Sequence, residues 1–257
     1  MHGMKKLIVG NWKMNPSNPK DAKKNFEKIK KGATLFKNID TAIASPFVYL
    51  PELSKISGSV LRLASQNVSA EKEGAFTGEI SADMLAQFKV SYAIVGHSER
   101  RDLGEGNEFI NKKIKLLLSK NITPILCVGE KERDSGMFYL GVVKTQVEEC
   151  LSGVPKNAIA KIVIAYEPVW ALSSTANRRD ATPEDFEEMR IYIRKIVSDM
   201  AGAQAGKDMR ILYGGSVDEK NAEGFLAHGK ADGLLPGRAS LTPEKFLGIL
   251  KVANGIK

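Results

Sequence analysis

One stretch of the sequence indicates both the fold and a candidate catalytic carboxylate. It is Ile162-Val163-Ile164-Ala165-Tyr166-Glu167-Pro168-Val169-Trp170. Its apolar run, 162–165, predicts a buried strand that brings the carboxylate of Glu167 to the strand's carboxyl end. Pro168 stiffens the exit, because its ring restricts φ and it has no N–H for a sheet ladder. The pattern therefore places Glu167 where a general base can act.

Short apolar runs of strand length recur along the chain, and helical patterns separate them. The predicted strands are 7–10, 41–45, 60–64, 92–95, 123–128, 162–165, 211–213 and 233–235. The predicted helices are 20–31, 49–56, 82–88, 108–120, 141–151, 183–200, 218–226 and 243–252. This alternation is typical of a parallel α/β sheet covered by helices. Eight such units in 257 residues favour a closed (β/α)8 TIM barrel, with an open doubly wound sheet as the alternative.

Composition indicates a globular chain without a separate linker or membrane span. No Gly/Ser-rich or Pro-rich segment interrupts the alternation, so we expect a single domain over residues 1–257. No apolar run approaches the roughly 20 residues that span a bilayer. The first residues contain no secretory signal, and we interpret Met4 as the natural start, with 1–3 as an addition. The two cysteines, Cys127 and Cys150, predict neither a disulfide framework nor a metal site and favour the cytoplasm.

A formal net charge of +8 favours anionic partners, either nucleic acid or small molecules. Many lysines, however, lie in the amphipathic stretch 20–31 together with Phe26 and Ile29, as on an ordinary solvated helix face. The sequence does not show the alternation of aromatic and basic residues that is typical of a nucleic-acid-binding groove, and it has no zinc-finger spacing. We therefore expect no nucleic-acid partner.

Polar residues cluster directly after several of the predicted strands. These clusters are 11–15 after the first strand, 96–101 after the fourth, Glu167 after the sixth, 214–216 after the seventh and 236–238 after the eighth. In a (β/α)8 barrel the chemistry lies on the loops that follow the carboxyl ends of the strands. The sequence thus predicts that these groups converge on one rim.

Three of these side chains have both a mechanistic and a structural interpretation. Lys13, just beyond a strand end, can lie over an anionic substrate or be an ordinary surface lysine. His97 follows a buried strand, where a neutral imidazole can donate to a carbonyl oxygen or be satisfied by backbone. Glu99 is either a second general acid or a structural partner. Its nearness to Arg100 and Arg101 favours a buried ion pair.

Two glycine-containing loops predict a phosphate site. Gly214-Gly215-Ser216 precedes a predicted helix, whose free N–H groups would bind phosphate, although ordinary turns use the same residues. Gly237, before the last helix, repeats the pattern. Barrels of this class often hold phosphate on the loops after strands seven and eight.

Longer motifs along nearly the whole chain carry a family resemblance. They are GNWKMN at 10–15, QN at 66–67, GAFTGEIS at 74–81, VGHSERR at 95–101, LCVGE at 126–130, AYEPVWA at 165–171 and YGGSV at 213–217. In this order, each after the expected strand, they resemble the triosephosphate isomerase family. The resemblance implies interconversion of dihydroxyacetone phosphate and D-glyceraldehyde 3-phosphate through an enediolate, a step of glycolysis and gluconeogenesis.

The resemblance also implies roles for individual residues. Glu167 would move the proton between adjacent carbons, and a neutral His97 would polarise the carbonyl, a pairing for which this family is an established example. Lys13 would stabilise the enediolate and help hold the phosphate, and Asn11 would hydrogen-bond the substrate oxygens. Glu99 would be a proton shuttle or an anchor. No metal or organic cofactor is implied, because fixed donors and a cation stabilise the carbanion.

In the family, the segment matching 74–81 enters a neighbouring subunit, where Thr77 would orient the lysine and the asparagine. The resemblance therefore implies a homodimer with Thr77, Phe76 and Met14 at the interface. The alternative is a long surface loop. The apolar tip at Ala75 and Phe76 favours the interface.

The lid departs from the family pattern, although Pro168, Val169, Trp170, Ser173, Ser174 and Thr175 occupy its position. The family continues Trp-Ala-Ile-Gly-Thr-Gly-Lys, whereas here a polar segment, Ser173 to Asp180, is about three residues longer and lacks the tip glycines. The N–H of Ser173 can still donate to phosphate, but loss of glycine narrows the φ range open to the hinge. The alternative function is a weakly active or inactive phosphate-binding homologue whose lid does not close.

Two further segments depart from the family. Its Val-Gly-Gly after the eighth strand is Pro236-Gly237-Arg238 here. Gly237 keeps its N–H, and Arg238 either binds phosphate bidentately, obstructs the site or points outward. We expect the phosphate to contact Asn11, Lys13, Ser173, Gly215, Ser216, Gly237 and Arg238, with Arg238 compensating for the changed lid. The segment 101–105 is also slightly shorter than in the family, next to the expected interface.

Overall fold

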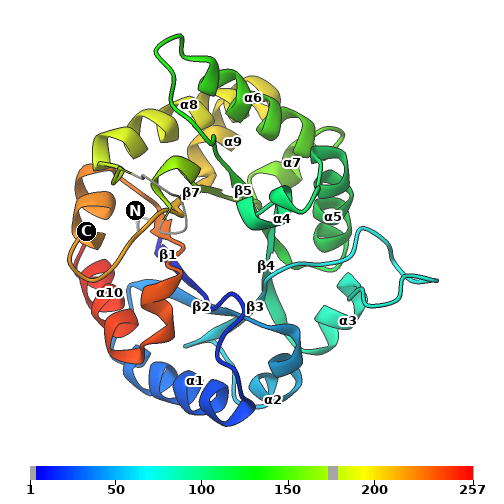
Figure 1. The fold of residues 1–257 in the computed structure, drawn as a ribbon, viewed down its shortest axis with the longest axis vertical. Coiled ribbons are helices and arrows are strands. Elements are labelled where there is room, and N and C mark those ends of the chain that lie inside the picture. The colour runs from blue at the N-terminus through cyan, green and yellow to red at the C-terminus, as the bar shows by residue number, and fades with distance from the viewer. Residues whose placement is uncertain (1–3, 173–178, 257) are drawn as a thin grey trace.

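The computed structural model describes residues 4–172 and 179–256, and its parallel strands close into one barrel in chain order (Figure 1). Each strand pairs with the next, and β8 pairs with β1. The strands are β1 (Lys6–Asn11), β2 (Ile39–Ser45), β3 (Arg62–Ser65), β4 (Val90–Val95), β5 (Thr123–Val128), β6 (Val163–Tyr166), β7 (Arg210–Tyr213) and β8 (Gly233–Leu234). The closed barrel is confirmed, and the open sheet is excluded.

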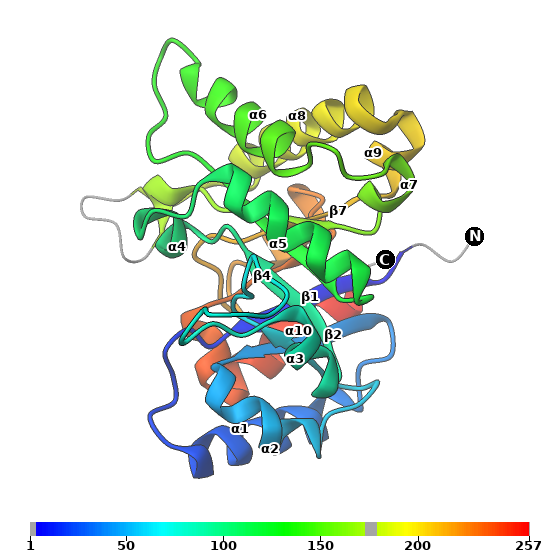
Figure 2. The same cartoon turned by 90° about the vertical axis from the view of Figure 1, so that its right-hand side faces the viewer.

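Helices surround the barrel on the outside (Figures 1 and 2). They are α1 (Pro19–Ala33), α2 (Leu50–Ser54), α3 (Ala82–Gln87), α4 (Ser98–Asp102), α5 (Asn107–Ser119), α6 (Phe138–Cys150), α7 (Lys156–Ile159), α8 (Pro183–Ala201), α9 (Ala203–Asp208) and α10 (Pro243–Gly255). Short helical turns are η1 (Phe47–Tyr49), η2 (Val169–Ala171), η3 (Gly224–His228) and η4 (Arg238–Leu241). Within the described residues, no helix has the length and apolar character needed to cross a membrane.

Local signals define the ends of the long helices. α8 begins with a capping box, in which the Thr182 hydroxyl accepts from the Asp185 N–H and the Asp185 carboxylate accepts from the Thr182 N–H. Pro183 occupies the first helical turn, where a missing N–H costs nothing. Gly202, with φ of 98°, follows the last turn. The helix therefore matches the predicted range 183–200 closely.

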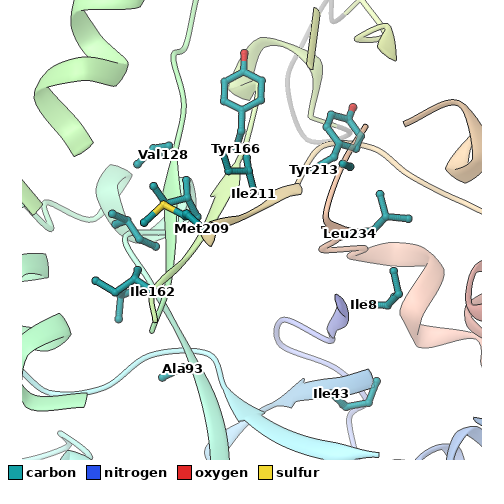
Figure 3. Packing of buried hydrophobic residues seen from close by; sticks show 14 of the residues in the cluster. Ile8, Ile43, Ala93, Val128, Ile162, Tyr166, Met209, Ile211, Tyr213 and Leu234 are labelled. Atoms are coloured by element: carbon teal, nitrogen blue, oxygen red, sulfur yellow. The ribbon is translucent and has the colours of Figure 1, made fainter. Parts of the chain in front are cut away.

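Side chains along the strands alternate between the barrel interior and the helix layer. The interior cluster is Leu7, Val9, Ala42, Ala44, Ala64, Tyr92, Ile94, Ile125, Cys127, Val163, Ala165, Leu212 and Leu235. The alternate residues point outward and pack beneath the helices. Figure 3 shows part of this outer layer, including Tyr166 and Tyr213. Both faces of the sheet are buried, which explains why the strands are continuously apolar in sequence.

The segment predicted as a helix at 218–226 is regularly helical over 222–228, after a turn at 219–221. The Asp218 carboxylate accepts hydrogen bonds from the N–H groups of Lys220 and Asn221, and its carbonyl accepts from the Ala222 N–H at 3.1 Å, which is the geometry of a helix N-cap. The helical turn η3 comes only later. No helix therefore opens directly at Gly214-Gly215-Ser216, which corrects the predicted helix N-terminus there. Three short helices, α4, α7 and α9, were not predicted, because segments of four to six residues give at most a weak helical period.

Candidate active site

Glu167 is held by its backbone at the carboxyl end of β6. Its N–H donates to the Val128 carbonyl at 2.8 Å, and the Gly214 N–H donates to the carbonyl of the preceding residue, Tyr166, at 2.8 Å. A Cβ added at Gly129 would lie 1.8 Å from the Glu167 carbonyl oxygen. Glycine at 129 is therefore required for the chain after β5 to approach Glu167 so closely.

The Glu167 carboxylate faces His97. Glu167 is 2% exposed, its Oε1 lies 3.1 Å from His97 Nε2, and its Oε2 accepts from the Ser98 N–H at 3.1 Å. His97 Nδ1 accepts from the backbone N–H of Glu99 at 3.2 Å. Because Nδ1 is an acceptor, the imidazole proton belongs on Nε2, where it points at Glu167. The geometry thus favours a neutral imidazole donor beside a buried carboxylate.

Glu99 forms a different ion pair from the predicted one. Its Oε1 lies 2.5 Å from Lys13 Nζ, and the two side chains are half exposed rather than buried. Arg100 pairs instead with Glu105, and Arg101 donates to oxygens of other segments. The prediction was wrong because α4 begins at Ser98, and a helix turns successive side chains by about 100°.

The backbone of Lys13 has an unusual conformation, with φ of 52° in the left-handed region. The Asn11 side-chain oxygen accepts from the Lys13 N–H at 3.0 Å, and Gln66 Nε2 donates to the Lys13 carbonyl at 2.8 Å. Such a conformation costs about 1 kcal/mol or more for a residue other than glycine, and these contacts hold it. Gln66 is therefore a positioning residue that its short motif did not reveal.

Most of the predicted site residues line one cavity of about 760 Å³ on the rim. The predicted residues in its lining are Asn11, Lys13, His97, Glu167, Gly215, Ser216, Gly237 and Arg238. Arg238 is exposed, and Gly237 precedes the short η4 rather than a long helix. Glu99 is not in this lining and contacts two residues that are, Lys13 and His97. Ser173, Ser174 and Thr175 lie outside the described residues.

The described ends of the lid segment are anchored by groups that the sequence analysis missed. Trp170 Nε1 and the Tyr166 hydroxyl both donate to Glu130 Oε1, at 2.7 Å. Burial and the Glu130 carboxylate together raise the pKa of Tyr166 well above its usual value. Beyond the lid, the Arg179 guanidinium lies 4.1 Å from the centre of the Trp170 ring and pairs with Asp185. The start of the lid segment, Pro168, Val169 and Trp170, is thus held in a fixed position.

The residues expected at an interface lie on the surface of this single chain. Met14 is 93% exposed, Phe76 is 47% exposed, and Thr77 is exposed beside it. The long connection between β3 and α3, which carries Phe76 and Thr77, projects away from the barrel (Figure 1). Exposed large apolar side chains on a projecting loop are typical of a surface that another chain covers.

Both cysteines are expected to be unreactive in the folded protein. Burial and the neighbouring Glu167 raise the pKa of Cys127 well above its usual value, and burial raises the pKa of Cys150 to about 11. Since the thiolate is the nucleophile, raised pKa values leave little reactive form at neutral pH. We expect no reaction with an aromatic disulfide reagent at pH 7.5 until guanidinium unfolds the chain, when two thiols react. Rapid reaction of the native protein would contradict this.

A closed (β/α)8 barrel whose rim cavity joins a buried carboxylate, an imidazole and a lysine defines an enzyme of proton transfer on small anions. The family model described as "Triosephosphate isomerase" matches residues 6–253. The chain belongs to the triosephosphate isomerase family, and it is an isomerase of that family.

Relatives named triosephosphate isomerase match almost the full chain. The protein of Aquifex aeolicus is 44% identical over 251 residues, covering 96% of this chain and 99% of the relative. The protein of Fusobacterium nucleatum is 40% identical, and the match covers 98% of this chain and 100% of the relative. The protein of Caldanaerobacter subterraneus is 42% identical, and the match covers 95% of this chain and 98% of the relative.

Proposed function

We propose that this chain interconverts dihydroxyacetone phosphate and D-glyceraldehyde 3-phosphate by moving a proton between adjacent carbons. The observation that carries the proposal is the 3.1 Å contact between Glu167 Oε1 and His97 Nε2 on the wall of the cavity that Lys13 also lines. A buried carboxylate beside a fixed donor and a cation supplies a base, an electrophile and charge stabilisation in one place.

Each polar group has a separate task in this proposal. The substrate's carbonyl oxygen takes over the His97 N–H, which frees Glu167 Oε1 to accept the carbon-bound proton. His97 and Asn11 donate to the oxygens of the enediolate, and Lys13 balances its negative charge. Glu99 holds the Lys13 ammonium group in place through their 2.5 Å contact. No step in this scheme uses a metal or a cofactor.

We assign the phosphate to the part of the cavity formed by the loops after β7 and β8. Gly215, Ser216, Gly237 and Arg238 all line it there, close to Lys13 in the same lining. Backbone N–H groups of glycine-containing turns bind anions, and the net charge of +8 helps to steer a dianion.

Replacing Arg238 by Gly is expected to raise KM for the triose phosphate about tenfold with little change in kcat. A hydrogen bond to a charged group contributes about 1.5–3 kcal/mol, and its loss acts on substrate binding before the chemical step. Steady-state kinetics in both directions measures the effect. An unchanged KM would show that Arg238 points away from the phosphate and does not compensate for the changed lid.

The proposal includes a homodimer. The exposed Met14, Phe76 and Thr77 support it, because burying them would remove large apolar surface from water. Sedimentation velocity should give twice the 28.1 kDa mass of one chain, and Phe76→Glu should shift the population toward the monomer. A monomeric wild-type protein would overturn the proposed homodimer and leave the proposed reaction untouched.

We also propose a cytoplasmic location, which the two free, buried thiols support.

A coupled assay tests the proposed reaction directly. Purified protein is given each triose phosphate in turn, and product is followed by a dehydrogenase that uses only that product. Turnover well above that of Glu167→Gln in both directions supports the isomerase. Phosphate binding without turnover above that variant would instead favour the inactive phosphate-binding homologue.

A further inference from the structure

A second cavity, of about 460 Å³, lies beside the substrate cavity, between α4 and α6 at the carboxyl end of β5. Its apolar wall includes Val128, Tyr139, Val142 and Val169. The size and the apolar lining with a few polar groups are typical of sites for small organic molecules. Among the residues that the structure describes, Glu167 alone lines both cavities, so the proposed base forms the wall between them.

The mouth of this second cavity is held in place by a local hydrogen-bonded turn. The Asp134 carboxylate accepts from the N–H groups of Phe138 and Tyr139, at 3.0 and 3.1 Å, and Met137 adopts a positive φ of 59°. This turn leaves the Phe138 side chain 79% exposed at the rim, next to Val142, which is 46% exposed. Exposed aromatic and aliphatic groups at a preformed opening mark a place where an apolar ligand gains contact area.

The charges around the second cavity favour a cation. Its acidic lining residues are Asp102, Glu130, Glu132, Asp134 and Glu167, and its basic ones are Arg101 and Lys131. Lys131 is paired with Asp102 at 2.6 Å, and Glu130 with Arg133 at 3.3 Å. Arg101 donates to backbone oxygens and keeps its charge, against the three remaining carboxylates of Glu132, Asp134 and Glu167. The lining therefore has an excess of negative charge, which a bound cation would balance.

A buried polar group at the second cavity also lacks a partner. Ser98 lines the cavity and is 7% exposed, and within the described residues its hydroxyl makes no hydrogen bond. A buried hydroxyl without a partner is unfavourable, and a ligand that offers a hydrogen-bonding group can satisfy it. Ser98 thus adds a polar contact point to the acidic rim.

We propose that the second cavity binds a small molecule with an apolar ring and a cationic amine or amidine head, and that binding there alters turnover. The coupling follows from two contacts: the Ser98 N–H holds Glu167 Oε2 at 3.1 Å, and the backbone at Gly129 packs against the Glu167 carbonyl. A ligand that shifts either segment moves the proposed base. It does not touch the phosphate loops, which line only the first cavity.

Benzylamine is the probe, and benzoate is its matched control of similar shape and opposite charge. Binding is measured by isothermal titration calorimetry with saturating inorganic phosphate present, so that the phosphate subsite is occupied. We expect benzylamine to bind with a Kd of about 1 mM, a typical strength for a ligand of this size, and benzoate at least about 10-fold more weakly. Equal binding of the two would overturn the assignment of a cationic ligand.

Val142→Trp is the blocking variant, since an indole at this rim position fills the cavity and Val142 is already half exposed. We expect at least about a 10-fold loss of benzylamine affinity with an unchanged Tm. Glu132→Lys, at an exposed rim position, is the second variant and should weaken binding through charge alone. Unchanged affinity in both variants would place the probe elsewhere and overturn the proposal.

Kinetics with saturating benzylamine then tests the coupling. We expect kcat to change at least about twofold while KM for the triose phosphate stays the same, because the two ligands occupy different cavities. A KM that rises in proportion to benzylamine would place it in the substrate cavity. Binding without any change in kcat would overturn the coupling. The calorimetric result stands apart from the proposed reaction, since it needs no turnover.

Discussion

Glu167→Gln is expected to lower kcat about 10³-fold in both directions while leaving the fold intact. The amide keeps the size of the carboxylate and can still accept from the Ser98 N–H, but it cannot take a proton from carbon. Removing a general base typically lowers the rate of the catalysed reaction by about 10²–10⁴-fold. The coupled assay with each triose phosphate measures the loss, and circular dichroism checks the fold.

Glu27→Gln is the matched control for this change. Glu27 is an exposed glutamate on α1, remote from the rim, and the same chemical replacement there should leave kcat within about twofold of wild type. If Glu167→Gln retained more than a tenth of wild-type kcat, another group would have to be the base. The assignment of His97 as its partner would then have to be revised as well.

Gly129→Ala is expected to lower both stability and activity. Its new Cβ would lie 1.8 Å from the Glu167 carbonyl oxygen, so the backbone after β5 or after β6 has to move. Forcing a methyl group into a packed site typically lowers the free energy of unfolding by about 1–3 kcal/mol. Because the backbone also has to move here, we expect a loss of about 3 kcal/mol. A displacement of about 1 Å at the base typically costs about 10²-fold in rate. Guanidinium unfolding and kcat measure the two effects.

Gly141→Ala provides the control for this second prediction. Gly141 lies on the exposed face of α6, and an added Cβ meets no atom within 4 Å. Alanine is favoured over glycine in a helix by about 0.5–1 kcal/mol, so this variant should be slightly more stable and fully active. Normal activity and stability in Gly129→Ala would show that the contact with Glu167 relaxes without consequence.

The strands could be predicted from sequence because the barrel buries both of their faces. β5 was predicted with the bounds that it has, Thr123–Val128, since Ile125 and Cys127 pack into the interior and Leu126 and Val128 pack beneath the helices. The regular part of the helix predicted at 218–226 begins later, at residue 222, because the chain first makes a turn that Asp218 caps through the N–H groups of Lys220 and Asn221. A capped turn of this kind has no hydrophobic period.

The chemical groups that follow each strand could be identified from the sequence alone, and parallel closure explains why Lys13, His97 and Glu167 reach one rim. Which of these groups are in contact depends on the folded arrangement. It paired Glu99 with Lys13 rather than with its neighbouring arginines, and it placed Glu167 between two cavities. The physical reason is that these contacts join the ends of different strands. Their distances depend on barrel closure and on the turn of α4, which no local pattern encodes.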